Sequence, residues 1–173
     1  EWMIWARDPW QNYRVTREGY QIQNGDYSFN RVLHGPPGPC EVLAGDKPQI
    51  KLTESPSWQY GDLSVGVETN GRVLWFHELD TIVSTHDAGM QHYVLRDSSV
   101  PGVEIRMSVA PMSDAPGFIV KLEPSCPVRI TWAYGALKYE EKSVFAQQPM
   151  PGGIRPADCA ENTFSVSASV VTA

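Results

Sequence analysis

Four histidines are the first side chains in this sequence with the chemistry to act as acids, bases or metal ligands: His34, His77, His86 and His92. His77-Glu78 begins like the H-E-x-x-H helix of zinc proteases, but Thr81 stands where the second His is needed and the segment has a strand-like composition. His86, Asp87 and His92 would share a metal only if the turn between them brought them together, and zinc needs three or four convergent ligands. The spacing therefore predicts hydrogen-bonded or surface histidines and no metal site.

Carboxylate pairs are the second source of chemistry to consider, because glycosidases use two carboxyl groups about 5 to 10 Å apart. Glu140 and Glu141 are adjacent, which places them on opposite faces of a strand or about 100° apart on a helix, as in a solvated patch. Glu78 and Asp80 share a strand face, and with His77 they are the candidates for a stand-alone sandwich enzyme that acts on sugars. The chain contains no G-x-S-x-G elbow, P-loop or dinucleotide fingerprint. We expect no catalytic residue and no cofactor in it.

Aromatic side chains offer a third possibility, because an indole has a flat apolar face that stacks on a sugar ring and an N–H that binds a polar group. Trp75 and Trp132 lie in apolar stretches and are expected to fill the core. Trp58 and Tyr60 lie in an expected loop with Ser57 and Gln59, so they are our candidate ligand-binding residues. The remaining tryptophans crowd the first ten residues, at Trp2, Trp5 and Trp10.

The elements that would position these residues are strands, since helical periodicity is nearly absent. Stretches rich in β-branched and aromatic residues alternate with Gly, Pro, Asn and Asp, and a turn at Asn24-Gly25 predicts a hairpin between residues 20–23 and 27–33. Further strands are expected at residues 48–52, 63–67, 72–77, 80–85, 91–96, 103–110, 118–123, 128–132 and 163–171, and a helical turn at 136–144. About ten strands at intervals of about 8 to 12 residues predict an all-β fold, an antiparallel sandwich or a barrel, with little helix.

Composition narrows the classes of partner. The chain has 173 residues, with 14 Lys+Arg against 20 Asp+Glu and a net charge of -6. No cationic face is concentrated enough for nucleic acid, and no apolar stretch approaches the ~20 residues of a membrane span. We expect one domain over residues 1–173, without a dense disulfide framework, because Cys40, Cys126 and Cys159 are few and widely spaced. They are expected to be buried or capped free thiols, with one bridge and one free thiol as the alternative.

The two ends suggest a piece of a longer protein. The sequence begins with Glu1 and ends just after an alternating strand pattern at residues 163–171. We expect the native chain to continue, so that these residues form its N-terminal fragment.

Four short motifs follow one another along the chain: Asn30, Arg31, Leu33 and Gly35, then Gly45, Asp46 and Pro48, then Asp114, Ala115 and Gly117, then Trp132, Ala133 and Gly135. In this order they resemble the N-terminal region of an uncharacterised bacterial family, the domain of unknown function numbered 4450. The resemblance covers about residues 12 to 136. It departs from the family in the Pro-rich loop after Gly35 and in a shorter turn around residues 55–60.

The resemblance implies a β-sandwich of the galactose-mutarotase-like, or supersandwich, type in a secreted or periplasmic bacterial protein. In that family the sandwich precedes an α-helical toroid of the kind found in glycoside hydrolases. The expected function is therefore a non-catalytic accessory domain that packs against the downstream domain of the same chain. The alternatives are a module that binds a poly- or oligosaccharide through Trp58 and Tyr60, and the sandwich enzyme named above.

Overall fold

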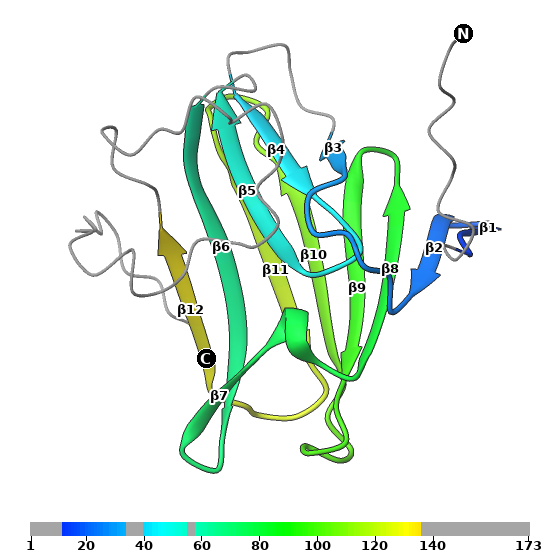
Figure 1. Ribbon diagram of the computed structural model, residues 1–173, viewed down its shortest axis with the longest axis vertical. Helices are drawn as coiled ribbons and strands as arrows, with labels where there is room; N and C mark the ends of the chain where they lie inside the picture. Colours follow the sequence, from blue (N-terminus) through cyan, green and yellow to red (C-terminus); the bar gives the residue numbers. More distant parts are fainter. Residues whose placement is uncertain (1–11, 34–39, 55–57, 136–173) are drawn as a thin grey trace, which may run out of the picture.

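The computed structural model of this chain describes residues 12–33, 40–54 and 58–135, with the backbone alone at residues 54 and 58–60 (Figure 1). Twelve strands in these ranges form two antiparallel sheets that pack face to face, which confirms the predicted all-β sandwich. The one helical element there is a 3-10 turn, η1 (Phe76–Glu78).

The first sheet has six strands in the order β1-β2-β8-β9-β10-β11, all antiparallel to their neighbours. Alternation decides which face is buried: in β10 the side chains of Ile105, Met107 and Val109 are buried and Arg106 is exposed. The strands are β1 (Arg14–Thr16), β2 (Gly19–Gln23), β8 (Thr81–Asp87), β9 (Met90–Arg96), β10 (Ile105–Pro111) and β11 (Phe118–Pro124).

The second sheet has the order β12-β6-β5-β4-β3, and β7 pairs with the far end of β6. Its centre is the 12-residue strand β6, which pairs with β12 on one side and with β5 and then β7 on the other. The strands are β3 (Arg31–Leu33), β4 (Glu41–Ala44), β5 (Gln49–Glu54), β6 (Trp58–Thr69), β7 (Arg72–Trp75) and β12 (Ile130–Gly135).

The hydrophobic core lies between the two sheets and draws on both. Tyr93, Leu95 and Met107 come from the first sheet, and Ile50 and Val65 from the second, and each is at most 2% exposed. Partly buried side chains of β11 and β12 close the side of the sandwich where both sheets end. Packing of this apolar surface is the main source of the fold's stability.

The prediction of a hairpin at Asn24-Gly25 is wrong. β2 pairs with β8, whereas β3 belongs to the other sheet, so the chain crosses between sheets after residue 24. Asn24 has φ 51° and exchanges hydrogen bonds with Ile82: its backbone N–H donates to the Ile82 carbonyl, and its side-chain oxygen accepts the Ile82 N–H, both at 2.8 Å. The asparagine therefore ends a pairing with a distant strand. A two-residue turn does join β6 to β7, with Asn70 and Gly71 at φ 50° and 75°.

Two tryptophans depart from the expected core positions. Trp132 is 58% exposed, because β12 is the last strand of its sheet among the described residues and its inward positions are only partly covered. Trp75 is half-buried, and its ring stacks on His77 with centroids 6.4 Å apart. Neither position is a fully enclosed core site.

Several expectations fall outside the described residues. Two of the three cysteines lie within the described residues: Cys40 is half-buried, Cys126 is exposed, and both are free thiols. Among the described elements, no helix is long and apolar enough to cross a bilayer. The expectations outside are the helical turn at 136–144, the strand at 163–171, Glu140 and Glu141, Cys159, His34 and the three N-terminal tryptophans.

Candidate functional site

The candidate ligand residues Trp58 and Tyr60 lie on a strand, so the expectation of a loop is wrong. β6 begins at Trp58, which pairs with Glu54 of β5, and the register shifts between Leu52 and Thr53 so that Tyr60 is the extra residue of a β-bulge. The side chains of both residues lie outside the description, and their role in binding a ligand stays a prediction.

The acid and base candidates His77, Glu78 and Asp80 do not converge. His77 is packed against Trp75, its Nε2 lies 4.0 Å from Glu78 Oε1, and its buried Nδ1 has no hydrogen-bond partner among the described residues. Burial lowers the pKa of His77 below its ordinary value, against the opposing effect of Glu78. Glu78 points to solvent, and Asp80 lies in the bend just before β8, where its carboxylate accepts the Ser98 N–H. This geometry does not assemble a general acid and base on one substrate.

Asp80 instead fastens the turn that follows β9. Its backbone N–H donates to Asp97 Oδ2 at 3.1 Å, and its own Oδ2 accepts the Ser98 N–H at 2.9 Å. Hydrogen bonds from the side chain and backbone N–H of Ser98 lower the pKa of Asp80, and those from Ser99, followed by the Asp80 N–H, lower the pKa of Asp97. Both carboxylates border an open hollow of about 640 Å³ that Arg96, Glu104 and Ser125 also line. Their contacts stabilise loops at the end of the sandwich.

His86 and His92 point to opposite faces of the first sheet. His86 faces the second sheet, with Nδ1 at 3.2 Å from Gln91 Oε1, whereas His92, next to Gln91 on β9, faces away and lies 2.9 Å from Ser108 Oγ. The two rings therefore cannot share a metal with Asp87. No group of three His, Cys, Asp or Glu side chains within residues 12–33, 40–54 and 58–135 is arranged to hold a metal ion.

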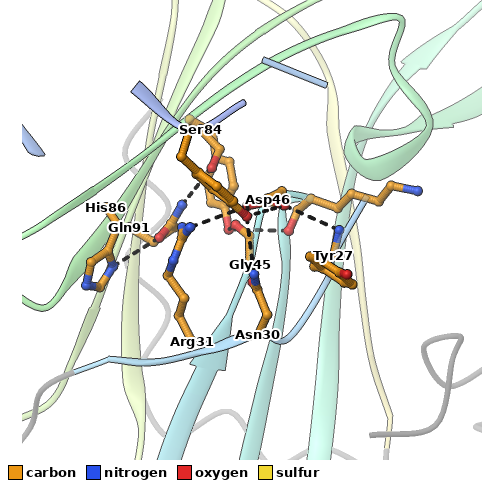
Figure 2. Close-up of polar contacts among 11 residues, drawn as sticks. Tyr27, Asn30, Arg31, Gly45, Asp46, Ser84, His86 and Gln91 are labelled. Atoms are coloured by element: carbon orange, nitrogen blue, oxygen red, sulfur yellow. Dashed lines mark hydrogen bonds and ion pairs between the residues drawn. The ribbon is translucent and has the colours of Figure 1, made fainter. Parts of the chain in front are cut away.

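The most concentrated polar site surrounds Asp46, in the turn between β4 and β5 (Figure 2). We call Tyr13, Asn30, Arg31 and Asp46 the Asp46 cluster. The Tyr13 hydroxyl lies 2.6 Å and 2.7 Å from the two carboxylate oxygens, and the Tyr27 N–H donates to Oδ2 at 3.4 Å. The site thus joins the residue preceding β1 to the β4–β5 turn.

The cationic member of the Asp46 cluster comes from β3. Arg31 Nη2 lies 3.7 Å from Asp46 Oδ1, and its guanidinium carbon lies 4.7 Å from the centre of the Tyr13 ring, within cation–π range. Asn30 donates its side-chain N–H to the Tyr13 hydroxyl at 3.3 Å. Arg31 Nη1 is buried and has no hydrogen-bond partner among the described residues. The Arg31 guanidinium therefore faces Asp46 from beyond hydrogen-bond distance.

Burial dominates the electrostatics of this cluster. Asp46 is 1% exposed, and loss of water raises its pKa, although hydrogen bonding to Tyr13 and the charge of Arg31 oppose the shift. Burial, together with the Asp46 hydrogen bond, raises the pKa of Tyr13 to about 12. Burial also raises the pKa of Tyr93, whose hydroxyl donates to the Gly45 carbonyl at 2.9 Å. The tyrosines stay protonated at neutral pH.

A second polar chain on the inner face of the first sheet links Ser84, Gln91 and His86. Gln91 is fully buried and donates its side-chain N–H to Ser84 Oγ at 2.9 Å, while its carbonyl oxygen lies near His86. An amide side chain is not a proton acceptor of useful strength. The link therefore does not activate Ser84 as a nucleophile, and the chain serves to satisfy buried polar groups.

Buried charge also occurs on the outer face of the second sheet. Lys51 of β5 and Asp62 of β6 are cross-strand neighbours with side chains each 3% exposed, and Lys51 Nζ lies 3.7 Å from Asp62 Oδ1. Phe29 covers the pair, with its ring centre 4.2 Å from Lys51 Nζ. Nearby, Gln49 bridges Ser28 and Ser64. The connection between β2 and β3 therefore packs on this face.

In the sequence, Asp46 and Arg31 stood out only as residues of the motifs that carry the resemblance, and no contact between them was predicted. The available signal was an acid in a Gly-Asp-Lys-Pro turn immediately before a strand that is buried on both faces. The partners of Asp46 were not visible, because Tyr13 is 33 residues away in the sequence.

Comparison with protein-family models, with curated proteins and with solved structures finds no match to this chain.

Proposed function

We propose that this chain is a non-catalytic accessory β-sandwich domain of a secreted or periplasmic carbohydrate-active protein. In this proposal it packs against a downstream catalytic α-helical toroid of the same chain. The observation that carries the proposal is that the buried titratable groups contact one another and neighbouring parts of the sandwich. Asp46, Lys51 and Asp62 join strands and connections of the sandwich, and they are not directed at a shared substrate position.

A second observation supports the same function. Several large apolar side chains are exposed at the side of the sandwich formed by β1 to β3, among them Val15 at 80% and Tyr20 at 56%. Val15 and Tyr20 are cross-strand partners and share the face of the first sheet that elsewhere forms the core. An apolar surface of this kind is typical of a face that another domain covers.

The test compares this chain with the product of the longer reading frame on a panel of polysaccharides, with released reducing sugar as the readout. We expect turnover by the longer product and none by the 173-residue chain. Substituting His77→Gln and Asp80→Asn in the longer product should leave its rate unchanged. Hydrolysis by the short chain at the rate of the whole, or loss of activity in the double variant, would contradict the proposal.

The β-bulge at Tyr60 favours a second candidate, a carbohydrate-binding module that uses Trp58 and Tyr60. Bulges redirect side chains and are frequent next to binding sites. Calorimetric titration of the chain with a panel of oligosaccharides should then give heat that Trp58→Ala removes. Trp132→Ala, which changes another tryptophan, is the matched control. Absence of heat with every sugar would exclude this candidate.

A further inference from the structure

Tyr13 and Asp46 make two short oxygen–oxygen contacts, but with an ionised carboxylate only one proton is available for both. The Tyr13 hydroxyl oxygen lies 2.6 Å and 2.7 Å from the two oxygens of Asp46, and a phenol has one hydroxyl proton. If Asp46 is ionised, that proton must be shared in a bent three-centre bond, or one contact places two lone pairs against each other. Hydrogen bonds weaken steeply with such bending.

A proton on the Asp46 carboxyl would remove this conflict. The carboxyl then donates through one oxygen to the Tyr13 hydroxyl and accepts the Tyr13 proton at the other, so that both short contacts are hydrogen bonds. The Tyr13 oxygen has two lone pairs, and the second accepts the Asn30 N–H at 3.3 Å. The full set of donors and acceptors is thus satisfied by the neutral carboxyl.

The surroundings favour the same protonation state. The Asp46 side chain is fully buried, and its nearest cation, Arg31 Nη2, lies at 3.7 Å, beyond hydrogen-bond distance. Burial raises the pKa of the carboxyl and outweighs the opposing effects of the Tyr13 hydrogen bond, the Arg31 charge and the Tyr27 amide, while the charge of Asp26 adds a smaller upward effect. The titratable and charged groups that face it are Tyr13 before β1, Asp26 in the β2–β3 connection, Arg31 of β3 and Tyr93 of β9.

Strand β1 has little else to hold it in place. It is three residues long, pairs only with β2 among the described strands, and lies at the outer edge of the first sheet (Figure 1). Its inward side chain, Val15, is 80% exposed and so adds almost no packing. The Tyr13 contact, immediately before the strand, therefore carries much of the attachment of β1 to the rest of the sandwich.

We propose that Tyr13 and Asp46 form a proton-dependent latch that fastens β1 when the carboxyl is neutral and loosens it when the carboxyl ionises. Opening places Asp46 in water, where a carboxylate is stable, and uncovers the backbone edge of β2 (Gly19–Gln23). The proton binds the closed state more tightly than the open one, so acidification closes the latch. Each unit of pKa difference between the two states changes the ratio of closed to open molecules about tenfold.

Hydrogen exchange followed by NMR on the full chain tests this latch between pH 4.5 and 8, with rates corrected for intrinsic exchange. Protection of the β1 amides should rise as Asp46 becomes protonated, about tenfold for each unit of pKa difference between the closed and open states, while protection in β10 stays constant. Asp46→Asn mimics the neutral carboxyl and should keep β1 protected at every pH. Asp114→Asn, at an exposed aspartate in the β10–β11 turn, is the matched control and should retain the pH dependence.

Carbon NMR of the Asp46 carboxyl gives a second readout that needs no variant. Its titration should lie above the ordinary range of aspartate and coincide with the change in β1 protection. An ordinary aspartate titration, or protection of β1 that does not change with pH, would overturn the proposal. Loss of β1 protection in a folded Asp46→Asn chain at low pH would overturn it as well.

Discussion

The buried pair Lys51–Asp62 allows a quantitative prediction about stability. Replacing Lys51→Met keeps the aliphatic stem over Phe29 but leaves the Asp62 carboxylate without its cation in a site where both side chains are 3% exposed. Breaking a buried ion pair on one side costs about 3 to 5 kcal/mol. Because the 3.7 Å distance is long for a charge-assisted hydrogen bond, we expect a loss near the lower end, about 3 kcal/mol.

The double variant Lys51→Met/Asp62→Leu separates two free energies: the destabilisation caused by burying one charge of the pair alone, and the net contribution of the ion pair to stability. With both charges removed, no desolvated carboxylate remains, and much of the loss should be recovered, giving a coupling of about 1 to 3 kcal/mol. Urea unfolding followed by tryptophan fluorescence measures each variant, with the slope of the transition checked for constancy.

The control is Lys121→Met on the exposed strand β11. Lys121 Nζ lies 2.8 Å from Glu123 Oε1, closer than in the buried pair, but the two side chains are 67% and 52% exposed. Exposed pairs contribute little, so its effect should stay below about 1 kcal/mol. A single Lys51→Met effect as small as this control, or a double variant as unstable as the sum of its single variants, would refute the reasoning.

Three further predictions concern other parts of the fold, and thermal or urea unfolding measures them all. A Cβ added by Gly45→Ala would clash with the Tyr27 carbonyl oxygen, so the variant should lose about 1 to 3 kcal/mol of unfolding free energy. Gly71→Ala has open space around it and should lose only the backbone strain of a non-glycine residue at φ 75°. Asn24→Ala removes the side-chain hydrogen bond to the Ile82 N–H and should lower the unfolding free energy by about 1 to 2 kcal/mol. An unchanged unfolding midpoint would contradict this. The pKa of His77 is lowered in the fold, so its contribution to stability is complete above the unfolded pKa of about 6.5 and is lost as pH falls through the folded pKa. His77→Gln should therefore flatten the decline of the unfolding free energy below about pH 6.5. An identical acid slope in the variant would refute this assignment.

The sheets were predictable from sequence wherever one face is buried and the other is not. Strand β10 was expected at residues 103–110 and observed at Ile105–Pro111, because its buried and exposed side chains alternate with period two. Local alternation does not state which strand is the partner. For this reason Asn24-Gly25 was interpreted as a hairpin, although Asn24 binds Ile82, 58 residues away.

The candidate sites were less predictable for the same physical reason. Asp46 depends on Tyr13, Arg31 and the Tyr27 amide, which only the folded chain brings together. Trp132 was placed in the core by its apolar neighbours, but its exposure depends on its strand being the last in the sheet. Neither burial at an edge nor a contact between distant residues leaves a periodic signal in one sequence.

The alternation of the chain between its two sheets also sets the order in which it can fold during synthesis. Strand β2 leaves the ribosome well before its partner β8, which ends at Asp87, after the whole of β3 to β7 has been made. At a translation rate of about 5 to 20 residues per second, β2 waits roughly 3 to 13 s for that partner. Throughout this interval β2 can pair with β1, but its other edge, which β8 later covers, stays open and is available to holdases before the first sheet closes.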